Sequence, residues 1–384
     1  MDIERFMKIL LLFLFWTLWF LNFSTRTIFS PILPLIEDDF GISHALAGGL
    51  FLSFYIGNTI AVFSSGFLSL RIGYKQSIFF CLLLVMISFF ALRFAGTYHL
   101  FTGVLFFLGL GTGLYLPCAI PLITSIFRRE NWGKAISFHE TAVGLSTLTV
   151  PLITVFALRF FHWRSLFILI SGACLVGIIF FLVFSPDTRP RKEIRIRLSV
   201  ILMRKDFWII TIVWSLCGVA TMGIYNIIPL YLVKERGIQM ELANSIFGLS
   251  RVGSFVSMIL IGFILDRFNL KKILLFLILA TGITTIGLAL AHSFWLLVVM
   301  LLVQATFSFV FFPAGLVAIS KITDLSERSL FTGVLMGIGG LMGPGLAPFL
   351  LGAVADVWNF QSGIFMVGLL CTLSCLLFRA LQEI

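Results

Sequence analysis

The chain has 384 residues, of which 60% are hydrophobic and 11% are charged, and its formal net charge is +10. Its mean hydropathy of +1.10 excludes a water-soluble globular protein, because a soluble surface needs far more charge to cover it. The net charge does not require a nucleic-acid partner, because the basic residues gather between apolar stretches.

Apolar stretches of roughly twenty residues or more follow one another along the chain. Each is long enough to cross ~30 Å of hydrocarbon as a helix. They predict an all-α integral membrane protein with twelve transmembrane helices, at 8–35, 45–69, 76–96, 98–127, 133–160, 164–185, 207–233, 242–266, 271–291, 294–320, 329–355 and 360–382.

Most of the 27 basic residues fall on one side of these predicted helices. Cytoplasmic loops carry the excess of Lys and Arg, so both termini are expected to be cytoplasmic. We expect a multi-pass monomer, in a bacterial inner (plasma) membrane. The basic linker at 186–206 is predicted to lie along the anionic inner leaflet, between an N-terminal six-helix bundle at 1–185 and a C-terminal one at 207–384.

The second half of the chain repeats the first in the same direction, which predicts two pseudo-symmetric bundles. Parallel repeats with a site between them characterise one large class of secondary transporters. Prolines at matched positions would bend helices that rock around a central cavity. The matched residues, each pair 196 apart, include Leu46 and Leu242, Gly57 and Gly253, Arg71 and Arg267, Lys75 and Lys271, and Pro117 and Pro313.

Two corresponding loops carry one motif. Residues 66–75 read GFLSLRIGYK, and residues 262–272 read GFILDRFNLKK. Both resemble the motif G-x-x-x-D-R-x-G-R-K of the major facilitator superfamily, and helix count, repeat and linker agree along the whole chain. The resemblance implies the major facilitator fold and a transporter by alternating access, not an enzyme. It also implies a gating role for Gly66, Arg71, Gly262, Asp266 and Arg267.

The chain departs from that family pattern at several positions. Leu70 replaces the acidic residue of the first motif, so the latch that the family implies would rest on Asp266 alone. Leu105 stands where proton-coupled drug exporters carry an arginine. The first helix, with Arg26, resembles that of organic-anion symporters and related anion exchangers, although Thr25 occupies the place of their acidic residue.

Charges inside a membrane helix cost free energy unless they are paired or hydrated, so they indicate functional sites. Arg26 and Arg251 lie at similar depths in opposite halves of the chain. Two guanidinium groups facing one cavity would bind a carboxylate or a phosphate through paired hydrogen bonds. The alternative for each arginine is a structural pair with a carboxylate or with backbone carbonyls.

Glu140 is the carboxylate that lies well inside a predicted helix, beside His139. A partly desolvated carboxylate can take up and release a proton, and a histidine can titrate near neutrality. Adjacent helical residues point about 100° apart, so we expect one of the two to face the cavity. Glu140 is the preferred proton-coupling residue, with His139 as the second candidate, and a structural partner for an arginine is the alternative.

Other polar residues are predicted to contribute to substrate binding. Each of them could instead form a hydrogen bond between helices. We therefore expect a secondary active transporter of a small organic anion, with proton symport, and neither a cofactor nor a metal. The alternatives are an exporter or flippase of amphipathic molecules, such as a drug or a lysolipid, and a non-transporting membrane sensor. The additional binding candidates are Tyr55, Asn58, Tyr115, Tyr225, Asn226 and Gln304.

Overall fold

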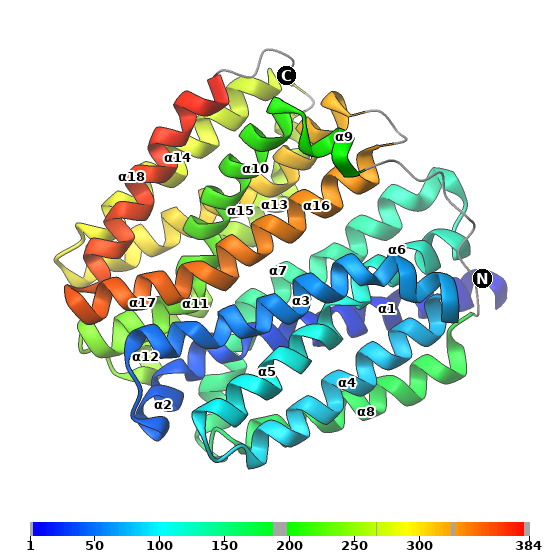
Figure 1. Ribbon diagram of the computed structural model, residues 1–384, viewed down its shortest axis with the longest axis horizontal. Helices are drawn as coiled ribbons and strands as arrows, with labels where there is room; N and C mark the ends of the chain where they lie inside the picture. Colours follow the sequence, from blue (N-terminus) through cyan, green and yellow to red (C-terminus); the bar gives the residue numbers. More distant parts are fainter. Residues whose placement is uncertain (1–2, 187–197, 266, 324–326, 380–384) are drawn as a thin grey trace. The chain divides into compact units, whose positions relative to one another are not determined.

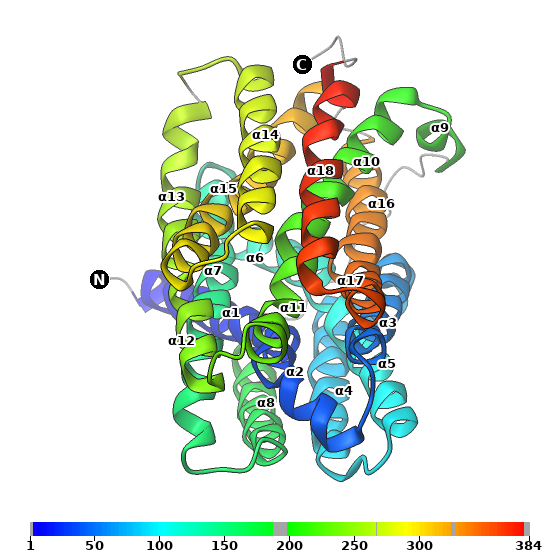
Figure 2. The same cartoon turned by 90° about the vertical axis from the view of Figure 1, so that its left-hand side faces the viewer.

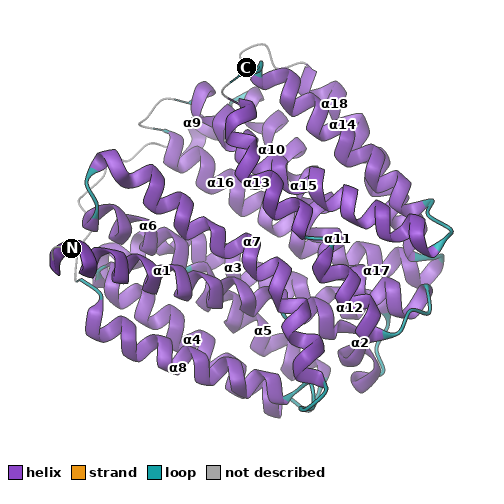
Figure 3. Cartoon of the chain, turned by 180° about the vertical axis from the view of Figure 1, so that it is seen from behind, coloured by secondary structure: helices purple, strands orange, loops and turns teal. Residues whose placement is uncertain are grey.

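The computed structural model describes residues 3–186, 198–265, 267–323 and 327–379. Helices are the regular elements of these ranges, which contain no strand (Figure 3). The all-α prediction is therefore confirmed. The chain forms two compact units: residues 1–32 with 53–193, and residues 33–52 with 194–384.

The helices of the first half of the chain agree with the predicted spans, apart from breaks inside the first and fourth. Both breaks have the same cause. A proline lacks the N–H group, and its ring clashes with the carbonyl four residues earlier. Pro31 follows the end of α1 by four residues, and Pro117 follows the end of α5 by four. The helices are α1 (Ile3–Thr27), α2 (Phe29–Phe40), α3 (His44–Ile72), α4 (Tyr74–Phe94), α5 (Tyr98–Gly113), α6 (Tyr115–Ile126), α7 (Trp132–Leu158) and α8 (Ser165–Phe184).

The second half differs by containing three π-helical segments, which widen the helical turn. One of them, Leu341–Leu346, contains Pro344, and another, Tyr231–Glu235, follows Pro229 closely. Pro313, in contrast, lies inside an uninterrupted helix, unlike its repeat partner Pro117. The third π segment is Val219–Gly223. The helices are α9 (Leu198–Leu202), α10 (Lys205–Gly218), α11 (Ile224–Leu230), α12 (Met240–Leu249), α13 (Val252–Leu265), α14 (Leu270–Ala289), α15 (Phe294–Ile322), α16 (Arg328–Gly340), α17 (Ala347–Val357) and α18 (Phe360–Arg379).

Among the described residues, eleven helical stretches are long and apolar enough to cross a membrane. The twelfth predicted span, 242–266, is divided into α12 and α13 by Ser250 and Arg251, so each piece alone is too short. These eleven stretches, of which the first and fourth contain the breaks described above, together with the divided span account for the predicted twelve.

Within each unit, neighbouring helices run side by side. In the first unit α4 packs along α8, and in the second α14 packs along α18 (Figures 1 and 2). Glycine permits the closest approach: a Cβ atom on Gly109 of α5 would lie 1.9 Å from the carbonyl oxygen of Phe54 on α3. The backbones of α5 and α3 can approach this closely because glycine has no side chain between them.

Basic residues at the helix ends anchor each unit. The Nζ atom of Lys75 donates to the carbonyl oxygens of Leu182 and Ser185, at 3.0 and 2.7 Å, and thereby caps the end of α8. Arg204 pairs with Asp206 and Glu327. The hydrogen bond with Asp206 raises the pKa of Arg204 above its ordinary value, because it favours the charged form.

The predicted domain boundaries stay predictions. Residues 33–52 group with the second unit rather than with the first, and most of the linker at 186–206 lies outside the described residues. Its described part contains the short helix α9.

Candidate functional site

Arg251 lies at a break in helical structure. Its N–H donates to the carbonyl of Gly248, three residues back, at 3.0 Å, whereas the α-helical pattern uses the fourth residue back. The helix resumes at once, since the N–H of Phe255 donates to the carbonyl of Arg251 at 3.0 Å. The break is therefore one tightened turn, and it carries the arginine that the sequence singles out.

Arg251 is only 1% exposed, and its guanidinium is enclosed by three aromatic rings. Its Cζ atom lies 4.7 Å from the ring centroid of Tyr225 on α11, 5.2 Å from that of Phe247 on α12 and 5.8 Å from that of Phe309 on α15. Cation–π attraction to these faces holds the charge in place. We call Arg251 with these three residues the Arg251 box.

The guanidinium in the Arg251 box has no anionic partner among the residues that the structure describes. Its Nε and Nη1 atoms are buried and make no hydrogen bond. None of the ion pairs among the described residues includes Arg251. The structural pairing that the sequence left open is therefore not found among the described residues. A buried charge without a counterion is costly, and an arriving anion would remove that cost.

The neighbouring amide side chains are already engaged. The Asn226 Nδ2 atom donates to the carbonyl of Pro344 at 3.0 Å, and the Gln304 Nε2 atom donates to the carbonyl of Ala220 at 2.7 Å. Both bonds join different helical segments of the second unit. Their observed contacts match the interhelical alternative, and a role in substrate binding stays a prediction.

Arg26, in the first unit, has a different environment. Its Nη2 atom donates to Asn22 Oδ1 at 3.0 Å, while its Nε atom is buried without a hydrogen bond. Its Cζ atom lies 4.9, 5.7 and 5.9 Å from the rings of Phe23, Trp19 and Phe54. The arginine is thus partly satisfied, and it keeps one free donor.

Two further candidates lie in the same unit. Tyr55 is 7% exposed, and its hydroxyl interacts electrostatically with the guanidinium of Arg26. The Asn58 Nδ2 atom donates to Thr112 Oγ1 at 3.0 Å, which joins α3 to α5. Tyr55 therefore belongs to the surroundings of Arg26, while Asn58 makes an interhelical contact.

His139 and Glu140 contact each other, with 3.1 Å between His139 Nδ1 and Glu140 Oε1. His139 is fully buried, whereas the Glu140 side chain is 40% exposed. On its other side, His139 Nε2 lies 3.4 Å from the hydroxyl of Tyr115, which donates to the carbonyl of Phe15 at 2.7 Å. The sequence predicts that the two side chains point in different directions. In the structure they nevertheless form one hydrogen-bonded pair.

Trp19 connects this pair to Arg26, and sequence reasoning assigned it no role in the site. Its ring stacks on His139 and on Tyr115, with centroids 5.6 and 5.3 Å apart, and it also faces Arg26. Its Nε1 atom is buried without a hydrogen bond. No sequence signal distinguishes Trp19 from the other tryptophans of the chain, because its partners come from α6 and α7.

The loop motif is described in part. Arg71 lies over the ring of Phe67, with Cζ 4.2 Å from the centroid, and Gly66 is an open helical position. Gly262 lies in α13 and Arg267 follows that helix, but Asp266 lies outside the described residues. The gating role of these five residues stays a prediction.

A second polar cluster, absent from the sequence-based candidates, joins residues 33–52 to the rest of the second unit. Asp356 accepts from the backbone N–H groups of His44 and Ala45, both at 2.9 Å, and so caps α3. His44 Nδ1 lies 2.7 Å from Glu37 Oε2, and Lys234 pairs with Glu37 at 3.7 Å. Glu37 and His44 are close in sequence, but Lys234 and Asp356 lie far from both, so no local pattern could have grouped the four.

Comparison with known proteins identifies the family. The family model described as Major Facilitator Superfamily matches residues 15–290 and 239–383. The multidrug resistance protein MdtL of Shewanella sp. strain ANA-3 is 23% identical over 64% of this chain and 63% of that protein, so the match spans less than two thirds of this relative. The membrane sensor protein UhpC of Escherichia coli strain K12 is 24% identical, over 94% of this chain and 89% of that protein.

Two further comparisons concern a sugar acid and a sugar. The hexuronate transporter of Bacillus subtilis strain 168 is 24% identical, over 90% of this chain and 88% of that protein. The crystal structure of a D-xylose–proton symporter superimposes with a TM-score of 0.83, covering 96% of this chain and 97% of that one, at 18% identity. The solved structure establishes the common fold.

Proposed function

Because the chain belongs to the Major Facilitator Superfamily and is a membrane transporter rather than an enzyme, we propose that it moves a small organic anion by alternating access. The observation that carries this proposal is the Arg251 box. A fully buried guanidinium with unused Nε and Nη1 donors offers charge-assisted hydrogen bonds to a carboxylate or phosphate.

Arg26 supplies a second anion-binding group in this proposal. Its free Nε donor and the free Nε1 donor of Trp19 are both buried in the first unit. The relatives support an anionic substrate, because one of them is a hexuronate transporter. Substrate identity follows from the uptake experiment below.

We propose that the His139–Glu140 pair couples transport to protons, as symport. The Tyr115 hydroxyl donates to the carbonyl of Phe15, and its oxygen lies 3.4 Å from His139 Nε2. The contact of 3.1 Å between His139 Nδ1 and Glu140 Oε1 lets a proton taken up by either group be shared between the imidazole and the carboxylate. Loss of such a proton would leave a nitrogen lone pair facing a carboxylate and weaken the contact.

Uptake into proteoliposomes tests the proposal. Labelled monocarboxylates, hexuronates and organic phosphates would be offered beside a neutral sugar of similar size, with and without an inward proton gradient. We expect uptake of at least one anion, stimulation by the gradient, and strong loss in Arg251→Lys, which keeps the charge without the planar donors. Uptake of the neutral sugar alone, equal in Arg251→Lys, would exclude the anion proposal.

Export of amphipathic molecules is the second candidate, and the match to MdtL favours it. The same vesicles distinguish it: a drug or lysolipid would move without competition from carboxylates. A sensor function, prompted by UhpC, predicts binding of an anion without any transport.

The proposed orientation has both termini in the cytoplasm. The six native cysteines are buried, so a thiol reagent would label a cysteine introduced at an exposed position instead. A membrane-impermeant thiol reagent added from outside should label His292→Cys and leave Arg128→Cys unlabelled in intact cells. The reverse pattern would invert the topology.

A further inference from the structure

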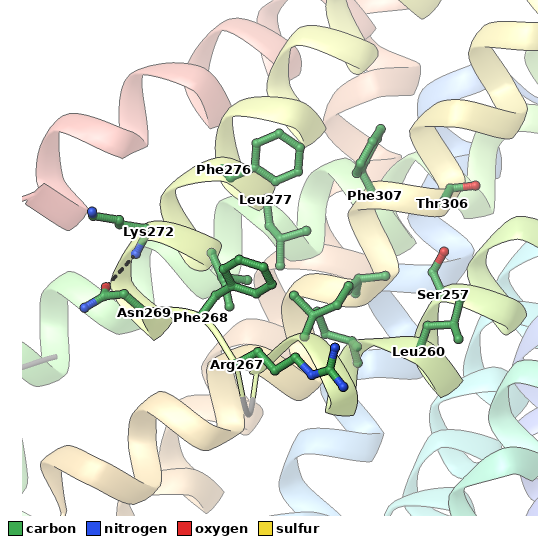
Figure 4. Close-up of a pocket in the computed structure, with 14 residues that line it drawn as sticks. Ser257, Leu260, Arg267, Phe268, Asn269, Lys272, Phe276, Leu277, Thr306 and Phe307 are labelled. Carbon is green, nitrogen blue, oxygen red and sulfur yellow. Dashed lines mark hydrogen bonds between the residues drawn. The ribbon is translucent and has the colours of Figure 1, made fainter.

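A groove of about 530 Å³ opens on the second unit between α13 and α14. Both helices pack along α15, but they make little contact with each other, so α15 forms the floor (Figures 2 and 4). Thr306 and Phe307 of α15 lie along this floor, as the close-up shows. The groove does not include Arg251.

The side chains along the groove are mostly apolar and face outward. Leu260, Phe268 and Phe276 are 50%, 64% and 58% exposed. These residues belong to or adjoin helices of the second unit, and we expect the apolar surface that they form to face lipid chains. A concave surface of this kind is suited to one acyl chain.

The length of the groove fits within one leaflet. Ser257 and Arg267 mark its limits along α13 and the turn that follows. From Ser257 to the end of α13 at Leu265, eight residues at 1.5 Å rise span ~12 Å. That length fits within one leaflet, which is half of the ~30 Å hydrocarbon core.

Two basic residues lie at one end of the groove. Arg267 and Lys272 flank the turn between α13 and α14, and Asn269 in that turn caps α14 by accepting from the N–H of Lys272 at 3.1 Å (Figure 4). None of the ion pairs among the described residues engages Arg267 or Lys272. The proposed topology places this end at the cytoplasmic surface, where anionic headgroups gather.

We propose that this groove is a binding site for one anionic phospholipid of the cytoplasmic leaflet, with its acyl chain along α15 and its headgroup at the end that carries Arg267 and Lys272. Basic pockets between membrane helices on this side bind anionic headgroups. The site is separate from the transport site, and it holds the lipid at the turn of the second loop motif.

The first unit provides an internal contrast. Its cavity of about 400 Å³ is lined by Lys75, Gln76, Phe79, Phe80 and Leu182. Gln76 occupies the repeat position of Lys272, and Lys75 already donates to the end of α8. This cavity therefore lacks the pair of available cations, and we expect no preference for anionic lipid there.

Native mass spectrometry of the full chain tests the proposal. The purified protein would be mixed with phosphatidylglycerol and phosphatidylcholine of identical acyl chains, and adducts would be counted. We expect one strongly retained phosphatidylglycerol. The double variant Arg267→Gln/Lys272→Gln should lower its apparent affinity about tenfold, because each basic residue contributes to anionic lipid binding. The matched control Arg128→Gln/Arg129→Gln removes the same charge elsewhere and should retain the lipid.

A second variant tests whether the acyl chain of the lipid lies in the groove. Ile264→Trp fills the groove from a residue that is 42% exposed, and it leaves both cations in place. It should abolish the retained lipid while the protein still elutes as one species on gel filtration. Equal retention of the two lipids by the unmodified protein, an equal loss in the control, or unchanged retention in Ile264→Trp would overturn the proposal.

Discussion

The surroundings of Arg26 and Arg251 differ, although the sequence presents the two residues as equivalents. Arg26 donates to Asn22, and the ring of Trp19 connects it to the titratable His139–Glu140 pair. Arg251 lies among three rings, with two donors unused and no carboxylate paired with it among the described residues. The guanidinium groups of both arginines lie over aromatic rings, but Arg26 also donates to Asn22, whereas two donors of Arg251 are unused.

This difference leads us to propose different roles for the two units in anion binding and proton coupling. An arginine whose charge is uncompensated attracts an anion strongly, because binding removes an existing electrostatic cost. An arginine with a hydrogen-bond partner gains less from the same anion. We therefore assign primary anion binding to the second unit and proton coupling to the first. Four substitutions test that assignment.

Glu140→Gln should have the largest effect. The amide can still bond to His139 but cannot take up a proton, so accumulation driven by a gradient should be lost while counterflow exchange continues. Proteoliposome accumulation and counterflow measure the two activities separately. Glu130→Gln removes an exposed carboxylate from the same unit and should retain both. Accumulation by Glu140→Gln against a gradient would make the carboxylate structural.

Arg251→Met should abolish detectable anion binding, with affinity falling about a hundredfold, because two hydrogen bonds to a charged group are lost. The thermal midpoint of the purified protein should not fall, since the substitution also removes a buried charge without a counterion. A lower midpoint with normal affinity would show that Arg251 serves the fold.

Arg26→Met should lower stability more, and anion affinity less, than Arg251→Met. The substitution leaves the buried Asn22 Oδ1 atom without its donor, which costs about 1–3 kcal/mol of stability. We expect a lower thermal midpoint and a loss of affinity of about tenfold, smaller than for Arg251→Met. Equal losses of affinity in the two variants would remove the distinction between the arginines.

Asn22→Ala should have the smallest effect on binding. It releases the Nη2 donor of Arg26, so affinity should change only a few-fold, while the contacts of Asn22 with Thr112 and Cys81 are lost. Comparing affinity in Asn22→Ala and in Asn22→Ala/Arg26→Met gives the coupling between the two residues. No coupling would mean that the 3.0 Å contact carries no energy.

The candidate residues illustrate how far sequence reasoning reaches. It selected Arg251 correctly as a buried charge, since the cost of an intramembrane charge depends on residue type and position alone. It grouped Asn58, Asn226 and Gln304 with possible binding residues, whereas each is engaged in a hydrogen bond across its unit. Trp19 escaped notice because its ring partners are distant in the chain, and the cluster of Glu37 and His44 did so because Lys234 and Asp356 are.

Hydropathy, the repeat at 196 residues and the loop motif determined the membrane location, the all-α fold and the family, because each is a property of residue order. Tertiary structure decided which polar groups retain unused donors, since that depends on what the neighbouring helices offer. The tightened turn at Arg251 and the groove between α13 and α14 belong to this second class. The groove arises from the way in which α13 and α14 both pack on α15, and local sequence patterns do not record that packing.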